Sequence, residues 1–123
     1  MFEPFLVAGV VNLVWCAVHV FVGGPAVARP LVLSTELGDA PKITQYYCWH
    51  LVTLTLALTG LGFLSVGLGY AGQPLGLFLT MLSAGFAALG LALAPLWRFS
   101  YSVLPQGWLF VPVTALGVWG LLG

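Results

Sequence analysis

The side chains able to do chemistry in this sequence fall into two short groups. The groups are Asn12, Cys16 and His19 in the first, and Tyr46, His50 and Thr53 in the second. Within each group the residues are four and then three positions apart, and residues at these spacings share one face of a helix. The sequence therefore predicts two polar stripes, each with an imidazole, which we expect to face each other inside the protein.

A site for a redox cofactor is the first chemical interpretation of the two histidines. Neutral imidazoles from two antiparallel helices can supply both axial ligands of a b-type haem, and an interior polar site of this kind also suits a quinone. Such a cofactor-binding site would consist of His19 and His50, with Tyr46 and Asn12 beside them and Arg98 closing it from the same membrane side. These residues leave the cofactor open, with haem b as one candidate.

A metal site is the second chemical interpretation. Its ligands would be His19, His50 and Cys16, because Cys16 and His19 share a helical face. Cys48 and His50 are only two positions apart and point in nearly opposite directions from a regular helix, which argues against a zinc site with four ligands. A proton relay also stays open. The interpretation that the residues favour over all of these sites is that the histidines only form hydrogen bonds across the helices, to Tyr46, Asn12 or a backbone carbonyl.

The sequence shows no apparatus for hydrolysis or acyl transfer. It contains no paired carboxylates, no combination of serine, histidine and acid, and no nucleophile elbow. A reaction of either kind needs a nucleophile and a base held within hydrogen-bond reach of each other. We therefore expect a protein that is not an enzyme.

The composition indicates a membrane protein. The chain has 123 residues, of which 61% are hydrophobic and 5% are charged, and its mean hydropathy is +1.10. Soluble domains carry about 25% charged residues, because water surrounds their whole surface. The expected surroundings are therefore lipid. The formal net charge of zero gives no basic surface for a nucleic acid, so no such partner is expected.

Four apolar runs are predicted to form helices, at about residues 4–23, 42–68, 75–96 and 103–122. Runs of about 20 apolar residues are long enough to cross a bilayer. The predicted fold class is therefore all-α, a polytopic four-helix transmembrane bundle in a single domain over residues 1–123. Gly23-Gly24-Pro25 is expected to end the first helix and begin a loop.

A ridge of small side chains is expected to pack the third helix against its neighbours. Thr80, Ala84, Ala88 and Ala92 recur every four residues along this helix. Helices in lipid associate through close backbone approach over small residues. We therefore expect this ridge to face the inside of the bundle.

The basic residues predict the orientation in the membrane. Arg29, Lys42 and Arg98 all fall in or beside the first and third connections. Short loops with basic residues favour the cytoplasmic side. The prediction is a multi-pass protein of the bacterial inner membrane with loops 24–41 and 97–102 in the cytoplasm and both termini outside. His19 and His50 would then lie in the same leaflet.

Four short motifs resemble those of a loose group of small four-helix bacterial membrane proteins of uncharacterised function. The motifs are His19-x3-Gly23, Arg29-Pro30-Leu31, Trp49-His50-x2-Thr53 and Pro105-Gln106-Gly107-Trp108. The resemblance implies a bacterial protein in which both histidines belong to one shared arrangement, and it supplies no catalytic residue. The chain departs from the four-histidine pattern of di-haem membrane cytochromes, because it has only two histidines.

Three functions follow as hypotheses. The first is an accessory or assembly subunit that packs against other membrane protein subunits or against itself, which suits a chain with short loops and many small residues. The second is an electron-transfer protein that binds a b-type haem or a quinone. The third is a small oligomeric transporter, which is disfavoured because no acidic residue is expected at mid-membrane.

Overall fold

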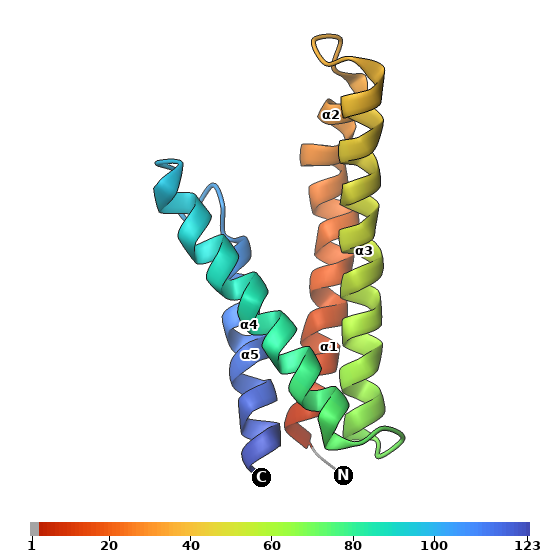
Figure 1. The fold of residues 1–123 in the computed structure, drawn as a ribbon, viewed down its shortest axis with the longest axis vertical. Helices are drawn as coiled ribbons and strands as arrows, with labels where there is room; N and C mark the ends of the chain where they lie inside the picture. Colours follow the sequence, from red (N-terminus) through yellow and green to blue (C-terminus); the bar gives the residue numbers. More distant parts are fainter. Residues whose placement is uncertain (1–2) are drawn as a thin grey trace.

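A computed structural model describes residues 3–123 and shows an all-helical chain (Figure 1). The elements are α1 (Glu3–Val18), η1 (His19–Ala28), α2 (Arg29–Leu33), α3 (Asp39–Gly67), α4 (Gln73–Leu96) and α5 (Gln106–Leu122). Because α1, η1 and α2 follow one another without a break, they form a single long helical segment. The prediction of an all-α chain with four helices is thus confirmed.

The first helix does not end at Gly23-Gly24-Pro25 as predicted. It continues as the π-helical segment η1 and then α2, so residues 24–33 are helical and only 34–38 connect it to α3. The wider register lets the chain pass Pro25, and the amide of Arg29 bonds the carbonyl of Gly24, five residues earlier. Pro25 therefore removes one backbone bond without ending the helix.

The other helix boundaries agree with the prediction or differ from it by at most three residues. α3 starts at Asp39 rather than residue 42, because Pro41 lies in its first turn, where no amide donor is needed. α5 starts at Gln106 rather than residue 103, because Pro105 restricts the preceding residue to extended backbone. The predicted 97–102 connection accordingly extends to Pro105.

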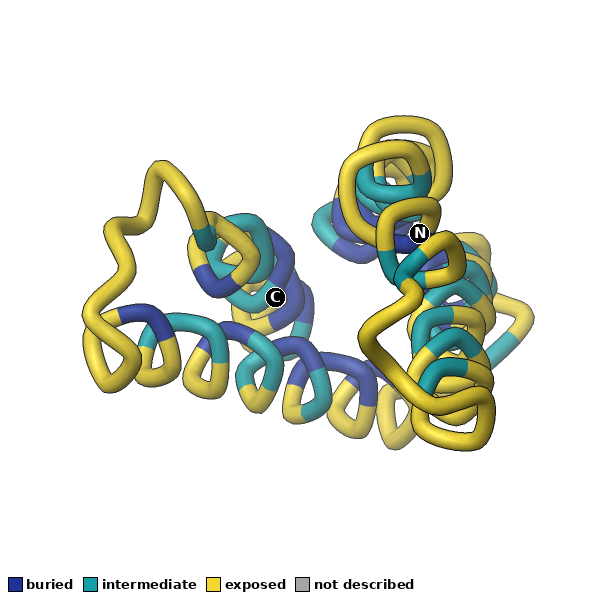
Figure 2. Tube along the Cα trace, turned by 90° about the horizontal axis from the view of Figure 1, so that it is seen from above, coloured by how far each residue is buried: buried dark blue, intermediate teal, exposed yellow. Residues whose placement is uncertain are grey.

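The chain folds into two helical hairpins. We call α1, η1, α2 and α3 the first hairpin, and α4 with α5 the second hairpin. The two hairpins meet at the end that holds both termini and the turn between α3 and α4, and they diverge toward the other end (Figures 1 and 2). The first hairpin is the longer one, since Glu3–Leu33 has 31 residues and α5 has 17.

The core that joins the hairpins is built around Phe5. Its ring is fully buried and stacks with the ring of Phe63 on α3, with centroids 6.0 Å apart. Gly76 on α4 and Gly120 on α5 also contact it, and an added Cβ at either glycine would lie within 2.9 Å of the Phe5 ring. The absence of side chains at these two positions lets both helices of the second hairpin approach the ring.

The predicted ridge on α4 is not the packed face. Ser83, Ala87 and Ala94 are buried, whereas Ala88 and Ala92 are exposed. A spacing of four residues drifts by about 40° per step around a helix with 3.6 residues per turn. The ridge therefore begins in the interface at Thr80 and leaves it within two turns.

Three helical segments are apolar and long enough to cross a membrane. These segments are Glu3–Leu33, Asp39–Gly67 and Gln73–Leu96, and Gln106–Leu122 is a shorter apolar helix. The 17 residues of α5 extend over about 26 Å, slightly less than a hydrocarbon layer of about 30 Å.

Candidate functional site

Hydrogen bonds join the first polar stripe to the backbone of α3. Asn12 Nδ2 donates to the carbonyl of Leu56 at 2.7 Å, and His19 Nε2 lies 3.2 Å from the carbonyl oxygen of Trp49. Between them, Cys16 Sγ lies 3.6 Å from the carbonyl oxygen of Thr53. We call these three side chains and their three carbonyl partners the seam.

The seam has mirrored spacings on its two helices. Its donors are four and three positions apart along α1 and the first residue of η1, and the accepting carbonyls at Trp49, Thr53 and Leu56 are four and three apart along the antiparallel α3. Since a carbonyl can only accept, His19 must carry its proton on Nε2. The polar stripe of α1 therefore binds backbone carbonyls of α3 rather than the polar stripe of that helix, which corrects the prediction that the two stripes face each other.

Trp49 is the residue that His19 contacts most closely. The two rings stack with centroids 3.9 Å apart and an angle of 19° between their planes. One turn later in the sequence, Gly23 makes room for the same indole, because an added Cβ there would lie 2.8 Å from Trp49 Cη2. The His19-x3-Gly23 spacing thus has a physical reason. The His19 ring packs on one face of the Trp49 indole, and Gly23 leaves room for the edge of the same ring.

This arrangement does not fit a haem between the first two helices. The His19 ring is packed on Trp49 and its Nε2 is bonded to a carbonyl, so it is not directed at a central iron. The two backbones are also in contact, since an added Cβ at Gly9 would lie 2.9 Å from the carbonyl oxygen of Gly60. A porphyrin held by His19 and His50 would need these helices to be separated.

A three-ligand metal site does not form either. No group of three histidine, cysteine or acidic side chains comes together anywhere in residues 3–123. Cys16 and His19 share a face as predicted, but their polar atoms are both directed at carbonyls of α3. His50 belongs to another surface of the hairpin.

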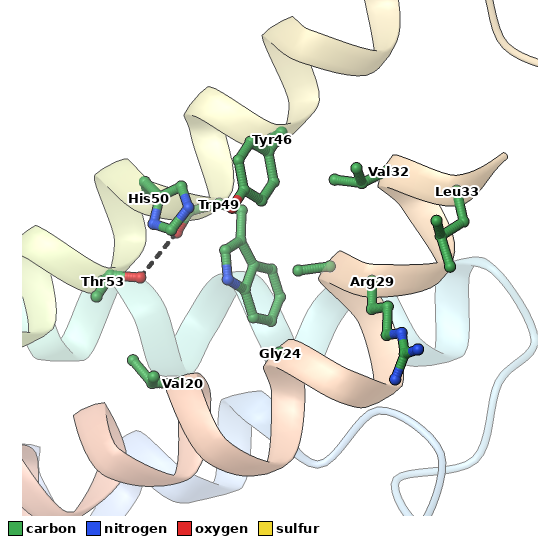
Figure 3. Close-up of a pocket in the computed structure, with 10 residues that line it drawn as sticks. Val20, Gly24, Arg29, Val32, Leu33, Tyr46, Trp49, His50 and Thr53 are labelled. Atoms are coloured by element: carbon green, nitrogen blue, oxygen red, sulfur yellow. Dashed lines mark hydrogen bonds between the residues drawn. The ribbon is translucent and has the colours of Figure 1, made fainter.

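A groove lies beside the seam, on the side of the hairpin where η1 and α2 run along α3 (Figure 3). Its volume is about 390 Å³. It is lined by Val20, Gly24, Ala28, Arg29, Val32 and Leu33 from the first helical segment, and by Tyr46, Trp49, His50 and Thr53 from α3. Most of the lining is apolar, and Trp49 belongs to both the seam and the groove.

The polar side chains of α3 are available in the groove. The Tyr46 and His50 rings meet edge to face, with centroids 4.5 Å apart. Within residues 3–123, neither the Tyr46 hydroxyl nor a ring nitrogen of His50 has a hydrogen-bond partner. Thr53 differs, because its hydroxyl bonds the carbonyl of Trp49 at 3.3 Å. The groove therefore offers, side by side, two hydrogen-bonding groups that have no partner within the described residues.

Arg29 contributes less than its charge suggests. Its stem lines the groove, but Figure 3 shows the guanidinium directed away from Tyr46 and His50. No carboxylate in the described part of the chain pairs with it. The positive charge thus lies at the edge of the groove.

Arg98 does not close the site as predicted. It lies just beyond α4, at the end where the second hairpin diverges from the first (Figures 1 and 2). Tyr101, three residues later, donates to the carbonyl of Leu91 and contacts the ring of Trp108. Tyr101 therefore belongs to the packing of the second hairpin, and neither residue lines the groove.

Sequence reasoning missed the role of two residues. Trp49 is not among the predicted site residues, yet it links seam and groove. Gly24 was assigned to a loop, yet it lies in η1 on the wall of the groove. The Gly-Gly-Pro sequence lies inside the π-helical segment that begins at His19, and it does not end the helix.

No protein-family model, curated protein or solved structure matches this chain. A function therefore has to be argued from the geometry of the seam and the groove.

Proposed function

We propose that this chain is a multi-pass integral membrane protein that binds a small lipid-soluble molecule in the groove between η1, α2 and α3. The role is one of binding rather than of catalysis, because the groove holds no nucleophile paired with a base. The proposal keeps the ligand-binding hypothesis drawn from the sequence and abandons its haem version.

The proposed setting is the bacterial inner membrane. The three apolar segments are long enough to cross it, and the basic residues lie at one end of the molecule. That end would face the cytoplasm and the termini would lie outside. Tyr46, Tyr47 and Trp49 then stand at the depth of the headgroups, where aromatic residues are enriched. The groove would open at this depth, within reach of molecules dissolved in the bilayer.

The observation that carries the proposal is the chemical make-up of the groove. Small-molecule sites typically have volumes of about 300–1,000 Å³ and apolar walls with a few convergent polar groups. The groove, at about 390 Å³, has apolar walls on η1 and α2 and the unused polar groups of Tyr46 and His50 on α3. At the depth of the headgroups these two groups can bond water, and a ligand that reproduces those hydrogen bonds can take the place of that water.

Gly24 gives further support. It lies inside a helical segment, where glycine costs about 0.5–1 kcal/mol relative to alanine. Gly23 needs to be small because Trp49 is adjacent, whereas an added Cβ at Gly24 would meet no atom within 4 Å. No contact within the protein therefore requires a glycine here. Its effect is to leave the wall of the groove flat.

The experiment uses this free space to fill the groove without disturbing the fold. Gly24→Leu places a large side chain in the groove, and Gly85→Leu is the matched control. Gly85 is also helical, and an added Cβ there meets nothing within 4 Å, but it lies on α4. Native mass spectrometry of protein extracted in mild detergent should show a bound small molecule in the wild type and in Gly85→Leu, and none in Gly24→Leu.

Two results would contradict the proposal. One is the absence of any bound small molecule from wild-type protein. The other is a bound molecule that persists unchanged in Gly24→Leu, since this would place it outside the groove.

An accessory role in a larger membrane complex is the second candidate, and the outer face of α4 favours it. Gly85, Ala88 and Ala92 are exposed there, and small residues at such spacings allow another helix to approach closely in lipid. The partner would be another membrane protein subunit or a second copy of the chain. Co-purification in mild detergent that is lost in Gly85→Leu and kept in Gly24→Leu would support this role, and a wild-type chain that migrates alone would contradict it.

The transporter hypothesis gains no support from the site. The acidic residues of the chain are Glu3, Glu36 and Asp39, and none of them lines the groove. A coupled transporter generally needs an ionisable group inside the membrane to couple ions.

A further inference from the structure

We infer that the ligand of the groove is a quinone: a neutral planar ring with carbonyl oxygens and an apolar tail. This inference rests on the proposed function and adds the chemical class of the ligand. Four features of the groove lead to it: its hydrogen-bonding groups, its charge, its aromatic surface and its size.

The available hydrogen-bonding groups select an acceptor. Tyr46 offers a hydroxyl and His50 offers a ring N–H, and the two rings are in contact. Both groups can donate to the same oxygen atom of a ligand, or to two oxygens on one edge of a ring. A ring carbonyl is such an acceptor.

The charge distribution argues against a phosphate head. A phosphate is bound most strongly by guanidinium or ammonium groups that point at it. Arg29 is the cationic side chain that lines the groove, and its guanidinium points away from Tyr46 and His50. No guanidinium or ammonium group of the lining is therefore directed at the polar centre of the groove, which suits a carbonyl better than a phosphate.

The aromatic surface suits a flat head. Tyr46, Trp49 and His50 all line the groove from α3, and aromatic side chains pack planar rings in stacked or edge-to-face arrangements. Trp49 is held in place by its stack on His19. The seam therefore supplies a fixed aromatic wall for the groove.

The size and shape of the groove suit a single ring with one tail. Val20, Gly24, Ala28 and Val32 follow one another along the first helical segment and form an apolar wall. A volume of about 390 Å³ accommodates a ring and the beginning of a chain, but not the two acyl chains of a phospholipid. The ring would lie beside Tyr46 and His50, and the tail would run past Gly24 and Val20 into the bilayer.

The test measures binding of a defined probe to the whole protein in phosphatidylcholine nanodiscs. A decyl-substituted benzoquinone is titrated while tryptophan fluorescence is followed, because quinones quench an indole that they contact and Trp49 lines the groove. We expect saturable quenching in the wild type and in the control Gly85→Leu. Binding should be about tenfold weaker in His50→Ala, which corresponds to the loss of one hydrogen bond, several-fold weaker in Tyr46→Phe, and absent in Gly24→Leu.

A second probe separates the two classes of head. Dodecyl phosphate has a single chain and an anionic head, and we expect no saturable binding of it. Saturable binding of dodecyl phosphate that Arg29→Gln abolishes would overturn the inference, because the head would then be recognised by charge. The melting temperature of every variant is measured alongside, so that loss of binding is separated from loss of fold.

Failure of the inference is distinguishable from failure of the proposed function. If native mass spectrometry shows a small molecule that Gly24→Leu removes, but the benzoquinone does not bind saturably, the groove is a ligand site and its ligand is not a quinone. The inference is also overturned if His50→Ala and Tyr46→Phe bind the benzoquinone as tightly as the wild type does.

Discussion

The seam and the groove are adjacent surfaces of one hairpin, and they use similar side chains in opposite ways. In the seam, Asn12 and His19 have donors bonded to carbonyls of α3. In the groove, Tyr46 and His50 have polar atoms with no partner in the described residues. An imidazole inside an apolar helix pair can therefore either bond across the helix interface or remain available to bond a ligand. Its hydrogen-bond partner decides which.

The boundary between the two regions is the change of helix type at His19. This residue is the last donor of the seam and the first residue of η1. The groove begins at Val20 and follows η1 into α2. π-Helical turns are often found at functional sites. Here the π-helical segment starts where direct packing against α3 gives way to a groove.

Substitutions at two glycines should give the largest difference in the free energy of unfolding between the α1–α3 interface and the groove. Gly60→Leu enlarges a residue of the α1–α3 interface, where an added Cβ would lie 2.7 Å from the Leu13 side chain. We expect it to lower the free energy of unfolding by roughly 3 kcal/mol, or about 10 °C in melting temperature. Gly24→Leu should change it by less than about 1 kcal/mol. Thermal unfolding in detergent measures both, and equal losses would show that the groove is packed as tightly as the interface.

Removal of the buried side-chain amide of Asn12 should lower the free energy of unfolding by less than Gly60→Leu does. Asn12 is fully buried, and its 2.7 Å bond to the carbonyl of Leu56 is lost in Asn12→Ala. We expect a loss of about 1–2 kcal/mol in the same unfolding assay. Asn12→Leu should be less damaging, because it fills the space and also removes Oδ1, which is buried without a partner. If Asn12→Ala and Asn12→Leu are both as stable as the wild type, the seam does not hold the helices together.

A substitution outside both regions should change the free energy of unfolding least, and should raise it rather than lower it. Arg98 has a φ of 59°, a left-handed conformation that is unfavourable for a residue with a side chain. Arg98→Gly relieves this and should raise the stability by about 0.5–1 kcal/mol. Benzoquinone binding should stay within twofold of the wild type. Weaker binding would show that Arg98 contributes to the ligand site, as the sequence predicted.

Much of the fold could be predicted from the sequence, because its physical causes are local. The apolar runs predict helices, and the spacing of Asn12, Cys16 and His19 predicts a single face. The continuation of the first helix through Pro25 could not be read in the same way. A glycine pair followed by proline ends most helices in water, whereas a longer register and packing against Trp49 keep this one intact.

The candidate site was predicted only in part, because the sequence does not show which partner a polar group finds. His19 and His50 have equal chemistry and similar spacing to their neighbours, yet one faces a carbonyl and the other faces the groove. The ridge at Ala88 and Ala92 failed for a geometric reason, since it drifts around α4 and out of the interface. Both errors concern the relative rotation of helices, which single-helix patterns do not determine.

The central claim is that His19 stabilises the helix interface and His50 binds the ligand. The most direct test replaces each histidine with alanine and measures both the free energy of unfolding and ligand binding. His19→Ala loses a ring stack and a hydrogen bond, and should lower the free energy of unfolding by about 1–2 kcal/mol. His50→Ala should lower it by less than about 0.5 kcal/mol and remove most of the affinity for the groove ligand. Two variants with equal losses of stability, or a His50→Ala protein that keeps its full affinity, would contradict the account.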